Sequence, residues 1–479
     1  MKKTILLILF FLSLNMFAQN KKEFRNDLQK KINHYLKETI EINEIPGASV
    51  AVIKNGKIIY QRYYGKGSLE KNTMVDQNSI FRLYSTTKLI TAVAIFQLIE
   101  KNKISLEDKI SKYLFDLPKE WQDVKIKNLV THSSGLPDIV KFEDIPYSLD
   151  ENEKWIRLYK KPIEFKTGDH YSYNQTNYCL LTKIIEKITG SSFEDFVLQN
   201  QFPNVKKGVV FSANSSAFIP GRVNHYVFDF KKKRYERFNA DHGKIHNSGS
   251  GLNLTLQEFI NWNERLDTNK LLNQETKNLM WQPFEFANKK DKFLYGWSEY
   301  STNNIHSLGF SGGYMTAFRK FTDEDLTIIF LSNGYKYFHI EEKVIDHIAG
   351  IIDEKLIDKK AWAEEEITNA FFKNDYTKAI QTYHALKSKN PILNFEDALL
   401  NIAYTLMNSD RLNESIKVFE LNVKENPTSF NAFDSLAEGY FNNKQFELSK
   451  ENYEKSLELN PKNENAKEML LKINNLIKK

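Results

Sequence analysis

One apolar stretch near residue 90 constrains the fold more than any other part of the chain. Residues 89–99 read Leu-Ile-Thr-Ala-Val-Ala-Ile-Phe-Gln-Leu-Ile and follow a polar start at residues 85–88, Ser-Thr-Thr-Lys. A segment of helical length that is apolar nearly all round predicts a helix buried in a core rather than one lying on a surface. We therefore expect the other elements to pack around this helix.

Two polar residues stand at the start of this helix. Ser85 and Lys88 are three positions apart, so they share one helix face. A serine in the first turn lies at the positive end of the helix dipole, and a lysine beside it can act as the base for its hydroxyl. The same spacing also fits a capping serine with a solvated lysine, so the motif needs support from context. A second copy, Ser68 to Lys71, leads into polar sequence, and we interpret it as chance.

Length and charge limit the class of protein. The chain has 479 residues, enough for two or three domains, and its 67 basic and 61 acidic residues give a net charge of +6. The excess is spread along the sequence, so we infer no nucleic-acid partner. The single cysteine, Cys179, excludes an internal disulfide.

The first eighteen residues have the pattern of a secretory signal. Lys2 and Lys3 precede a short apolar run, and residues 16–18, Met-Phe-Ala, offer a cleavage site. The run is too short to span a membrane comfortably. We therefore predict a signal peptide over residues 1–18 and an exported protein, periplasmic or extracellular.

Strand patterns occur at both ends of the first 360 residues. Residues 48–54 and 57–64 flank Asn55-Gly56, a strong hairpin signal, and residues 313–321 and 326–331 flank a second turn at 323–325. The region between them reads as helical over residues 176–200, with a break at Gly190, and as loops over a site at 203–250. A helix is predicted at 340–356. One antiparallel sheet built from both ends, with a helical subdomain inserted between them, is an α+β arrangement.

The composition changes from about residue 365, where glycine nearly vanishes and helical spacing takes over. Residues recur at a period of 34, which is typical of tetratricopeptide repeats. The matching pairs are Phe433 with Leu399, Leu436 with Ile402, Ala437 with Ala403, Ser449 with Ser415, Tyr453 with Phe419 and Pro461 with Pro427. The segment 365–479 resembles three such repeats, the first degenerate, and a generic helical solenoid is the alternative. Either way we expect an all-α interaction module with no chemistry of its own.

The order of motifs in residues 30–355 resembles the serine β-lactamase-related family, which includes class C β-lactamases, D-alanyl-D-alanine peptidases and esterases. The resemblance is carried by Ser85 to Lys88, by Leu129 to Pro137, by Tyr173 in its loop, and by Gly312-Gly313 with the following hairpin. It implies a β-lactamase-like serine hydrolase domain over residues 19–358. It also implies hydrolysis through an acyl-enzyme, with no metal or other cofactor.

The resemblance assigns roles residue by residue. Ser85 is the nucleophile, Lys88 takes its proton, Tyr173 helps to relay that proton, and the backbone N–H groups of Ser85 and Gly313 hold the oxyanion. The predicted oxyanion and substrate-binding residues are Gln175, Ser311, Gly312 and Gly313. The family has asparagine at position 175, so an amide is retained there. His132 and Tyr171 are expected to be structural.

Two motifs are interpreted as chance. Residues 166–168, Lys-Thr-Gly, match a β-lactamase signature by letter but precede Tyr173 in a loop. Residues 309–313, Gly-Phe-Ser-Gly-Gly, match a nucleophile elbow, which needs a following helix where this chain has strand sequence. The signature itself aligns with residues 310–312, so Phe310 stands where relatives carry a cation. His306 could replace that cation only with an insertion.

A phenylalanine at this position predicts weak binding of substrates that carry a carboxylate. The cation that would pair with the carboxylate is missing, and such charge-assisted bonds contribute roughly 1.5–3 kcal/mol. We predict hydrolysis of an ester, amide or D-amino-acid peptide, with weak β-lactamase activity at best. The expected partners are a small-molecule or peptidoglycan-like substrate and a protein or peptide ligand on the repeats. The alternative is a catalytically silent penicillin-binding-like or adaptor protein that binds partners through its helical repeats.

Overall fold

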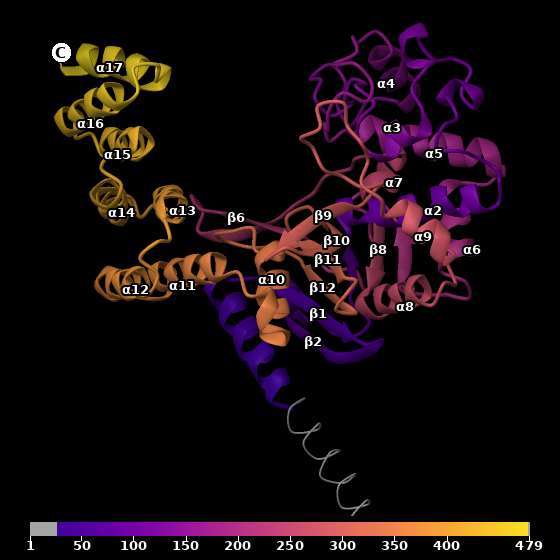
Figure 1. Cartoon of the computed structure of the whole chain (residues 1–479), viewed down its shortest axis with the longest axis horizontal. Coiled ribbons are helices and arrows are strands. Elements are labelled where there is room, and N and C mark those ends of the chain that lie inside the picture. Colours follow the sequence, from indigo (N-terminus) through magenta and orange to yellow (C-terminus); the bar gives the residue numbers. More distant parts are fainter. Residues whose placement is uncertain (1–25, 478–479) are drawn as a thin grey trace, which may run out of the picture. The chain divides into compact units, whose positions relative to one another are not determined.

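The computed structural model describes residues 26–477 (Figure 1), so the predicted signal peptide lies outside the described residues. The described chain forms two compact units. One contains the residues up to Val227 together with Glu236–Ile357, and the other contains Phe228–Tyr235 and the chain from Asp358. No described helix is both long and apolar enough to cross a bilayer.

A seven-stranded antiparallel sheet forms the centre of the first unit. Strand β1 pairs with β12 from Ala48 opposite Ser332 to Lys54 opposite Leu326. This pairing confirms that one sheet is built from both ends of the domain. The order is β3-β2-β1-β12-β11-β10-β9. The bounds are β1 (Gly47–Lys54), β2 (Lys57–Ser68), β3 (Thr73–Met74), β9 (Ser298–Thr302), β10 (Ile305–Gly312), β11 (Thr316–Phe321) and β12 (Leu326–Ser332).

Tight turns join neighbouring strands. Asn55 and Gly56 have φ of 50° and 66°, the positive pair that a two-residue hairpin requires. The predicted strand 313–321 starts later, at Thr316, because Gly313 and Tyr314 form the turn from β10 to β11. Both have φ of 59°, and the amide of Met315 donates to the carbonyl of Gly312 at 3.0 Å. This turn faces the start of the buried helix.

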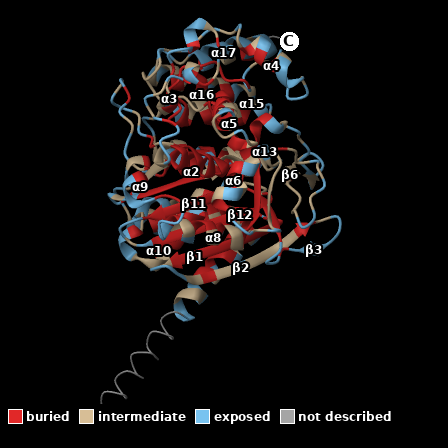
Figure 2. Cartoon of the chain, turned by 90° about the vertical axis from the view of Figure 1, so that its right-hand side faces the viewer, coloured by how far each residue is buried: buried red, intermediate tan, exposed pale blue. Residues whose placement is uncertain are grey.

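Helix α2 (Thr87–Glu100) is the predicted central helix, and its residues from Thr87 to Leu98 are buried (Figure 2). It lies in the core on one face of the sheet. The helices that contact it are α5 (Gln175–Thr189), α6 (Phe193–Gln201), α7 (Asn247–Ser250) and α9 (Gln274–Met280). The predicted break at Gly190 is confirmed, since this glycine ends α5 with φ of 69°.

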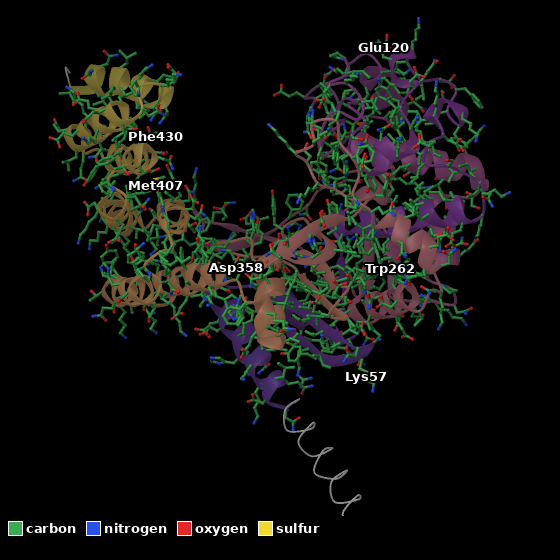
Figure 3. The ribbon with its side chains drawn as sticks, viewed as in Figure 1. Lys57, Glu120, Trp262, Asp358, Met407 and Phe430 are labelled. Carbon is green, nitrogen blue, oxygen red and sulfur yellow. The ribbon has the colours of Figure 1, made fainter. Side chains whose placement is uncertain are left out.

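The opposite face of the sheet has a core of its own. Residues 26–42 form a helix, and α10 (Glu341–Ile352) closes the same layer. Their apolar faces meet β1 and β12 through Ile32, Leu36, Val50 and Val344. On the α2 face, Trp262 of α8 (Leu256–Asp267; Figure 3) is fully buried, and its indole N–H donates to Gln201 Oε1 at 2.8 Å.

Residues 203–250 contain more regular structure than their sequence predicts. They include β5 (Val209–Phe211), β6 (Tyr226–Asp229) and β7 (Arg234–Arg237), which are strands of only three or four residues. Strands β4 (Ile80–Arg82), β8 (Leu252–Thr255) and β5 form a second sheet in the order β4-β8-β5. Runs this short carry no readable alternation, which is why the sequence indicates loops.

Apart from residues 228–235, the described part of the second unit is a series of helices (orange to yellow in Figure 1). Its periodicity appears in the hydrogen bonds. Ser415 Oγ donates to the carbonyl of Ala403 at 2.7 Å, and Ser449 Oγ donates to that of Ala437, 34 residues later, at 2.8 Å. The helices are α11 (Lys359–Lys373), α12 (Tyr376–Lys389), α13 (Glu396–Asn408), α14 (Leu412–Glu425), α15 (Phe430–Asn442), α16 (Phe446–Leu459) and α17 (Glu464–Ile477).

Candidate active site

Ser85 lies in a short 3-10 turn (Tyr84–Thr86) that leads directly into α2. Hydrogen bonds from two threonine hydroxyls hold this turn against the sheet. Thr86 Oγ1 donates to the carbonyl of Phe310 at 3.3 Å, and Thr316 Oγ1 donates to the carbonyl of Leu83 at 2.9 Å. The turn is therefore fixed against strands β10 and β11.

The structure brings Tyr173 to Ser85. The Tyr173 hydroxyl donates to Ser85 Oγ at 2.7 Å. Tyr173 lies in the loop before α5, and the next residue, Asn174, donates its backbone N–H to His132 Nδ1 at 3.0 Å. The predicted relay residue is thus in direct contact with the predicted nucleophile.

Lys88 is completely buried one turn beyond Ser85. Its ammonium donates to Gln175 Oε1 at 3.1 Å and to the carbonyl of Gly249 at 2.9 Å. Its Nζ also lies 4.8 Å from the ring centroid of Tyr173. Within residues 26–477 it makes no hydrogen bond to Ser85, so Tyr173 contacts the hydroxyl and Lys88 supplies a charge behind it.

Gln175 is the first residue of α5. Its backbone N–H donates to Asp138 Oδ1 at 3.0 Å, which orients the start of the helix. Burial raises the pKa of the Asp138 carboxyl above its usual value. Because the Gln175 side-chain oxygen accepts from Lys88, its NH₂ group is the part that can donate to a substrate.

Two glycines let the turn between β10 and β11 approach the nucleophile. A Cβ on Gly312 would come within 2.3 Å of the Leu83 carbonyl and 2.8 Å of the Ser85 nitrogen. A Cβ on Gly313 would come within 2.6 Å of the Tyr84 ring. These contacts place the backbone N–H groups of Ser85 and Gly313 on facing segments, as an oxyanion hole requires.

Phe310 occupies the position where the family signature has a cation. Its side chain is 7% exposed, and its ring centroid lies 6.3 Å from that of Tyr173 and 6.2 Å from that of Phe293. His306 does not replace the cation, because it lies at the other end of β10, where Nδ1 contacts Glu299 at 2.9 Å. The wall next to Tyr173 is therefore aromatic and uncharged.

Ser311 was predicted to bind substrate, but its hydroxyl does not point to the site. Neighbouring residues of a strand point to opposite faces, and the Ser311 hydroxyl donates to the Glu342 carboxylate of α10. Glu342 also accepts from the Tyr300 hydroxyl at 3.1 Å and pairs with the buried Arg319. Ser311 lies inside β10, so the Gly-x-Ser-x-Gly match is not a nucleophile elbow.

His132 belongs to the wall behind Tyr173. Burial, together with the charge of Lys88, holds the pKa of its imidazole well below 6.5, so the ring is neutral. Its Nδ1 accepts from the backbone of Asn174, which puts the ring proton on Nε2. That nitrogen is buried and has no hydrogen-bond partner among the described residues, and the ring centroid lies 4.7 Å from that of Tyr173.

Three participants were not found from the sequence. They are the Gly249 carbonyl, the Asp138 carboxylate and the pair formed by Tyr84 and His225. Each acts through a contact between segments at least 37 positions apart, and no local pattern marks such contacts. The motif at residues 166–168 is a loop, as expected, where Thr167 Oγ1 donates to the Ser134 carbonyl at 2.8 Å.

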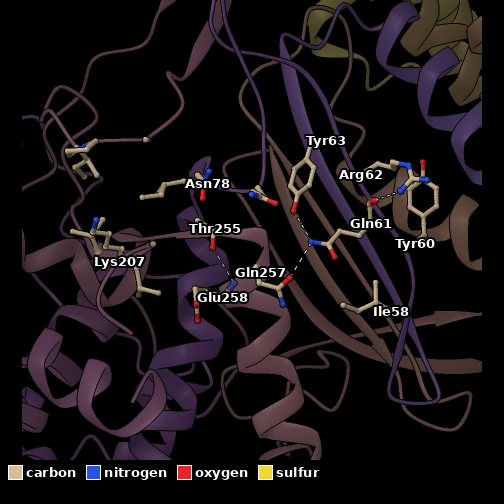
Figure 4. A pocket seen from close by; sticks show the side chains of 18 of the residues that line it. Ile58, Tyr60, Gln61, Arg62, Tyr63, Asn78, Lys207, Thr255, Gln257 and Glu258 are labelled. Carbon is tan, nitrogen blue, oxygen red and sulfur yellow. Dashed lines mark hydrogen bonds between the residues drawn. The ribbon is translucent and has the colours of Figure 1, made fainter. Parts of the chain in front are cut away.

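A cavity lies away from these residues (Figure 4). It has a volume of about 1330 Å³, and none of the predicted catalytic residues lines it. In its wall, Gln61 Nε2 of β2 donates to Gln257 Oε1 of α8 at 3.5 Å. Its walls are mainly amides and aliphatic side chains, so we do not place the chemistry there. Among the described residues, no group of three His, Cys, Asp or Glu is arranged to hold a metal ion.

A serine bonded to a tyrosine, a buried lysine one turn on and a glycine turn facing the serine define an acyl-transfer type of site. Comparison with known sequences agrees with this type of site. A family model described as beta-lactamase matches residues 32–349, and a tetratricopeptide repeat model matches residues 432–463. The chain belongs to the beta-lactamase family and carries a tetratricopeptide repeat near its C-terminal end.

Individual relatives are more distant. The protein flp of Staphylococcus aureus is 28% identical over 178 residues, which are 36% of this chain and 36% of that protein. Penicillin-binding protein 4* of Bacillus subtilis is 25% identical over 344 residues, covering 66% of this chain and 75% of that protein. The chain thus matches little more than a third of the length of the first relative.

Solved structures share the fold. The octameric penicillin-binding protein homologue from Pyrococcus abyssi has a TM-score of 0.57 at 22% identity, covering 71% of this chain and 81% of that one. EstCE1, a hydrolase with promiscuous acyltransferase activity, has a TM-score of 0.56 at 17% identity, covering 65% and 94%. At these identities the likeness establishes the β-lactamase-type fold and nothing finer.

Proposed function

We propose that this protein is an exported serine hydrolase that acts on an uncharged ester, amide or D-amino-acid peptide through an acyl-enzyme. The observation that carries the proposal is the 2.7 Å hydrogen bond between Tyr173 and Ser85, with the ammonium of Lys88 buried behind it. Export rests on the sequence of residues 1–18 alone. The relatives named for penicillin binding, and EstCE1, described as a hydrolase with promiscuous acyltransferase activity, both support acyl transfer as the type of reaction.

In the first step Ser85 Oγ attacks the substrate carbonyl carbon. Its proton moves to the Tyr173–Lys88 pair, which acts as the base in the form that lacks one proton. The Ser85 and Gly313 N–H groups stabilise the oxyanion, a contribution of typically 10²–10³-fold in rate for each such donor. When the tetrahedral intermediate collapses, the bond to the leaving group breaks and that group takes the proton from the pair. Water then attacks the acyl carbon by the same steps and releases the acid.

The substrate preference follows from Phe310. An aromatic side chain beside Tyr173 offers no charge to a substrate carboxylate. The missing charge-assisted bond is worth roughly 1.5–3 kcal/mol, which corresponds to about a tenfold to hundredfold loss in binding. Neutral acyl compounds lose nothing at this position, so they are favoured over penicillins and over peptides with a free carboxyl terminus.

The test compares two chromogenic substrates on the chain from residue 19. We expect hydrolysis of the neutral ester p-nitrophenyl butyrate, and a kcat/KM for nitrocefin far below that of dedicated β-lactamases. Ser85→Ala should abolish ester hydrolysis. Rapid nitrocefin turnover would contradict the substrate assignment, and unchanged ester hydrolysis in Ser85→Ala would contradict the mechanism.

A second candidate is a catalytically silent penicillin-binding-like or adaptor protein. The aromatic Phe310 and the engagement of Ser311 by Glu342 favour it. In that case the repeats would hold a protein or peptide ligand. Deleting residues 365–479 separates the candidates, because an adaptor loses its partner and a hydrolase keeps its ester turnover.

A further inference from the structure

Tyr84, the residue before the nucleophile, has a backbone conformation that tyrosine rarely adopts. Its φ is 48°, in the left-handed region where a bulky side chain is a genuine outlier. Such conformations persist only where the surroundings impose them, and they cluster at functional sites. The surroundings of Tyr84 are therefore informative about how Ser85 is held.

Three contacts hold the Tyr84 side chain. Its hydroxyl forms a 2.6 Å hydrogen bond with His225 Nδ1. The guanidinium carbon of Arg82 lies 4.7 Å from its ring centroid. On the side of the sheet, the ring lies so close to Gly313 that even a methyl group there would come within 2.6 Å of it. The ring thus fills the space between the nucleophile turn and the turn after β10.

His225 is well suited to this contact. Burial lowers the pKa of its imidazole to about 3, and burial raises the pKa of the Tyr84 phenol to about 12. Both partners therefore stay neutral at ordinary pH, and their bond does not titrate. The His225 ring is backed by Phe238, whose ring centroid lies 4.6 Å away.

We propose that Tyr84 and His225 are a positioning pair that sets the spacing of the oxyanion hole. One donor, the N–H of Ser85, is covalently next to Tyr84, and the other, the N–H of Gly313, belongs to the residue that packs on its ring. A shift of the ring displaces one donor relative to the other. Among the described residues, neither side chain hydrogen-bonds to Ser85, Lys88 or Tyr173, so the pair acts by positioning. This inference rests on the proposed function, since it assigns a role in the same acyl transfer.

The test measures the rate at which a fluorophosphonate labels Ser85 in the chain from residue 19. Tyr84→Phe keeps the ring and removes the hydrogen bond, and we expect labelling to slow by about tenfold, part of the 10²–10³-fold that a lost oxyanion donor costs. His225→Ala should slow it similarly, and His225→Asn should restore part of the rate because its amide can bond near the Nδ1 position. The double variant Tyr84→Phe/His225→Ala should be labelled no more slowly than His225→Ala, because both changes remove the same hydrogen bond.

A matched control is Tyr113→Phe. It removes another tyrosine hydroxyl hydrogen bond, of 2.6 Å to Asp108 Oδ2, within residues 108–113. Its labelling rate should equal that of the unmodified chain. The slowing by Tyr84→Phe should also be a constant factor from pH 6 to 9, since neither partner titrates there.

Substrate chemistry distinguishes a purely structural role of the Tyr84–His225 pair from a role in spacing the oxyanion hole. Replacing the carbonyl oxygen of an ester by sulfur weakens its acceptance of oxyanion-hole bonds, so a displaced hole discriminates less between the two esters. Tyr84→Phe should lower kcat and this oxo-to-thiono preference while leaving KM within error. Labelling of Tyr84→Phe at the full rate would overturn the inference and leave the hydrolase assignment intact. A chain that is never labelled at Ser85 would overturn both.

Discussion

The Oη of Tyr173 lies 2.7 Å from the Oγ of Ser85, although the two residues are 88 positions apart in the chain. The loop that carries Tyr173 is fixed by the bond from Asn174 to His132 and by the ring of Tyr173 against that imidazole. The turn that carries Ser85 is fixed by hydroxyl bonds to β10 and β11. Two separately anchored segments thus meet at one hydrogen bond.

This relationship predicts the effect of Tyr173→Phe. Removing the phenol oxygen removes the group that contacts Ser85 Oγ, so kcat for a neutral ester should fall by about 10²–10⁴-fold, the usual worth of a general acid–base. KM should change little. Tyr171→Phe is the matched control, because it removes a phenol from the same loop and its ring packs on Phe293, with centroids 4.9 Å apart. Equal losses in the two variants would contradict a chemical role for Tyr173.

Phe310→His should change which substrates are accepted. A histidine at this position can carry the positive charge that the aromatic wall lacks, beside Tyr173. We expect nitrocefin acylation to rise by about tenfold and hydrolysis of p-nitrophenyl butyrate to fall or stay level. The ratio of the two kcat/KM values is the readout, because it cancels any loss of folded protein. An unchanged ratio would show that position 310 does not select against carboxylates.

Gly313→Ala tests the close approach of the β10–β11 turn. The new methyl group would lie 2.6 Å from the Tyr84 ring at a residue whose φ is 59°. We expect kcat to fall by about 10²-fold through displacement of the oxyanion donor. Gly56→Ala is the control, since its φ is 66° and no atom of the described residues lies within 4 Å of the added carbon. It should cost about 1 kcal/mol of stability and no activity. Matching activity losses would mean that backbone strain, not the contact, governs the site.

Glu341 predicts how stability depends on pH. It is 5% exposed at the start of α10, and burial raises the pKa of its carboxyl to about 7. The folded state therefore keeps its proton up to about pH 7, whereas the unfolded chain loses it near 4.5. Stability from this group is complete below about pH 4.5 and is lost as the pH rises through about 7.

Glu341→Gln should remove that loss. At pH 8 the variant should be more stable to urea by about 1–3 kcal/mol, and the two proteins should converge near pH 5. The exposed Glu120 (Figure 3) supplies the control Glu120→Gln, which should follow the unmodified chain at both values. A constant difference at all pH values would show that the carboxyl does not titrate in this range.

Much of the fold follows from local sequence. The Asn55-Gly56 turn, the all-round apolar helix after Lys88 and the break at Gly190 are each decided by a few neighbouring residues. The 34-residue spacing of Ser415 and Ser449 likewise corresponds to one repeated bond. In these places backbone preference and burial pattern favour the same structure.

The site could be predicted only in part. Ser85, Lys88 and Tyr173 do come together, because their motifs mark the elements that carry them. The second acceptor of Lys88, the Gly249 carbonyl, and the partner of Tyr84 come from segments whose approach depends on packing of the whole domain. The Ser311 hydroxyl contacts Glu342 because neighbouring side chains of a strand point to opposite faces of the sheet. A three-letter motif does not show which face a residue occupies unless the register of the strand is known.

The most direct measurement for the central claim is covalent labelling of the nucleophile. The chain from residue 19 and its Ser85→Ala variant are treated with a fluorophosphonate, and the modified peptide is mapped by mass spectrometry. The account predicts one adduct, on the peptide that contains Ser85, and none in the variant. An adduct at Ser311, or labelling that persists in Ser85→Ala, would contradict it.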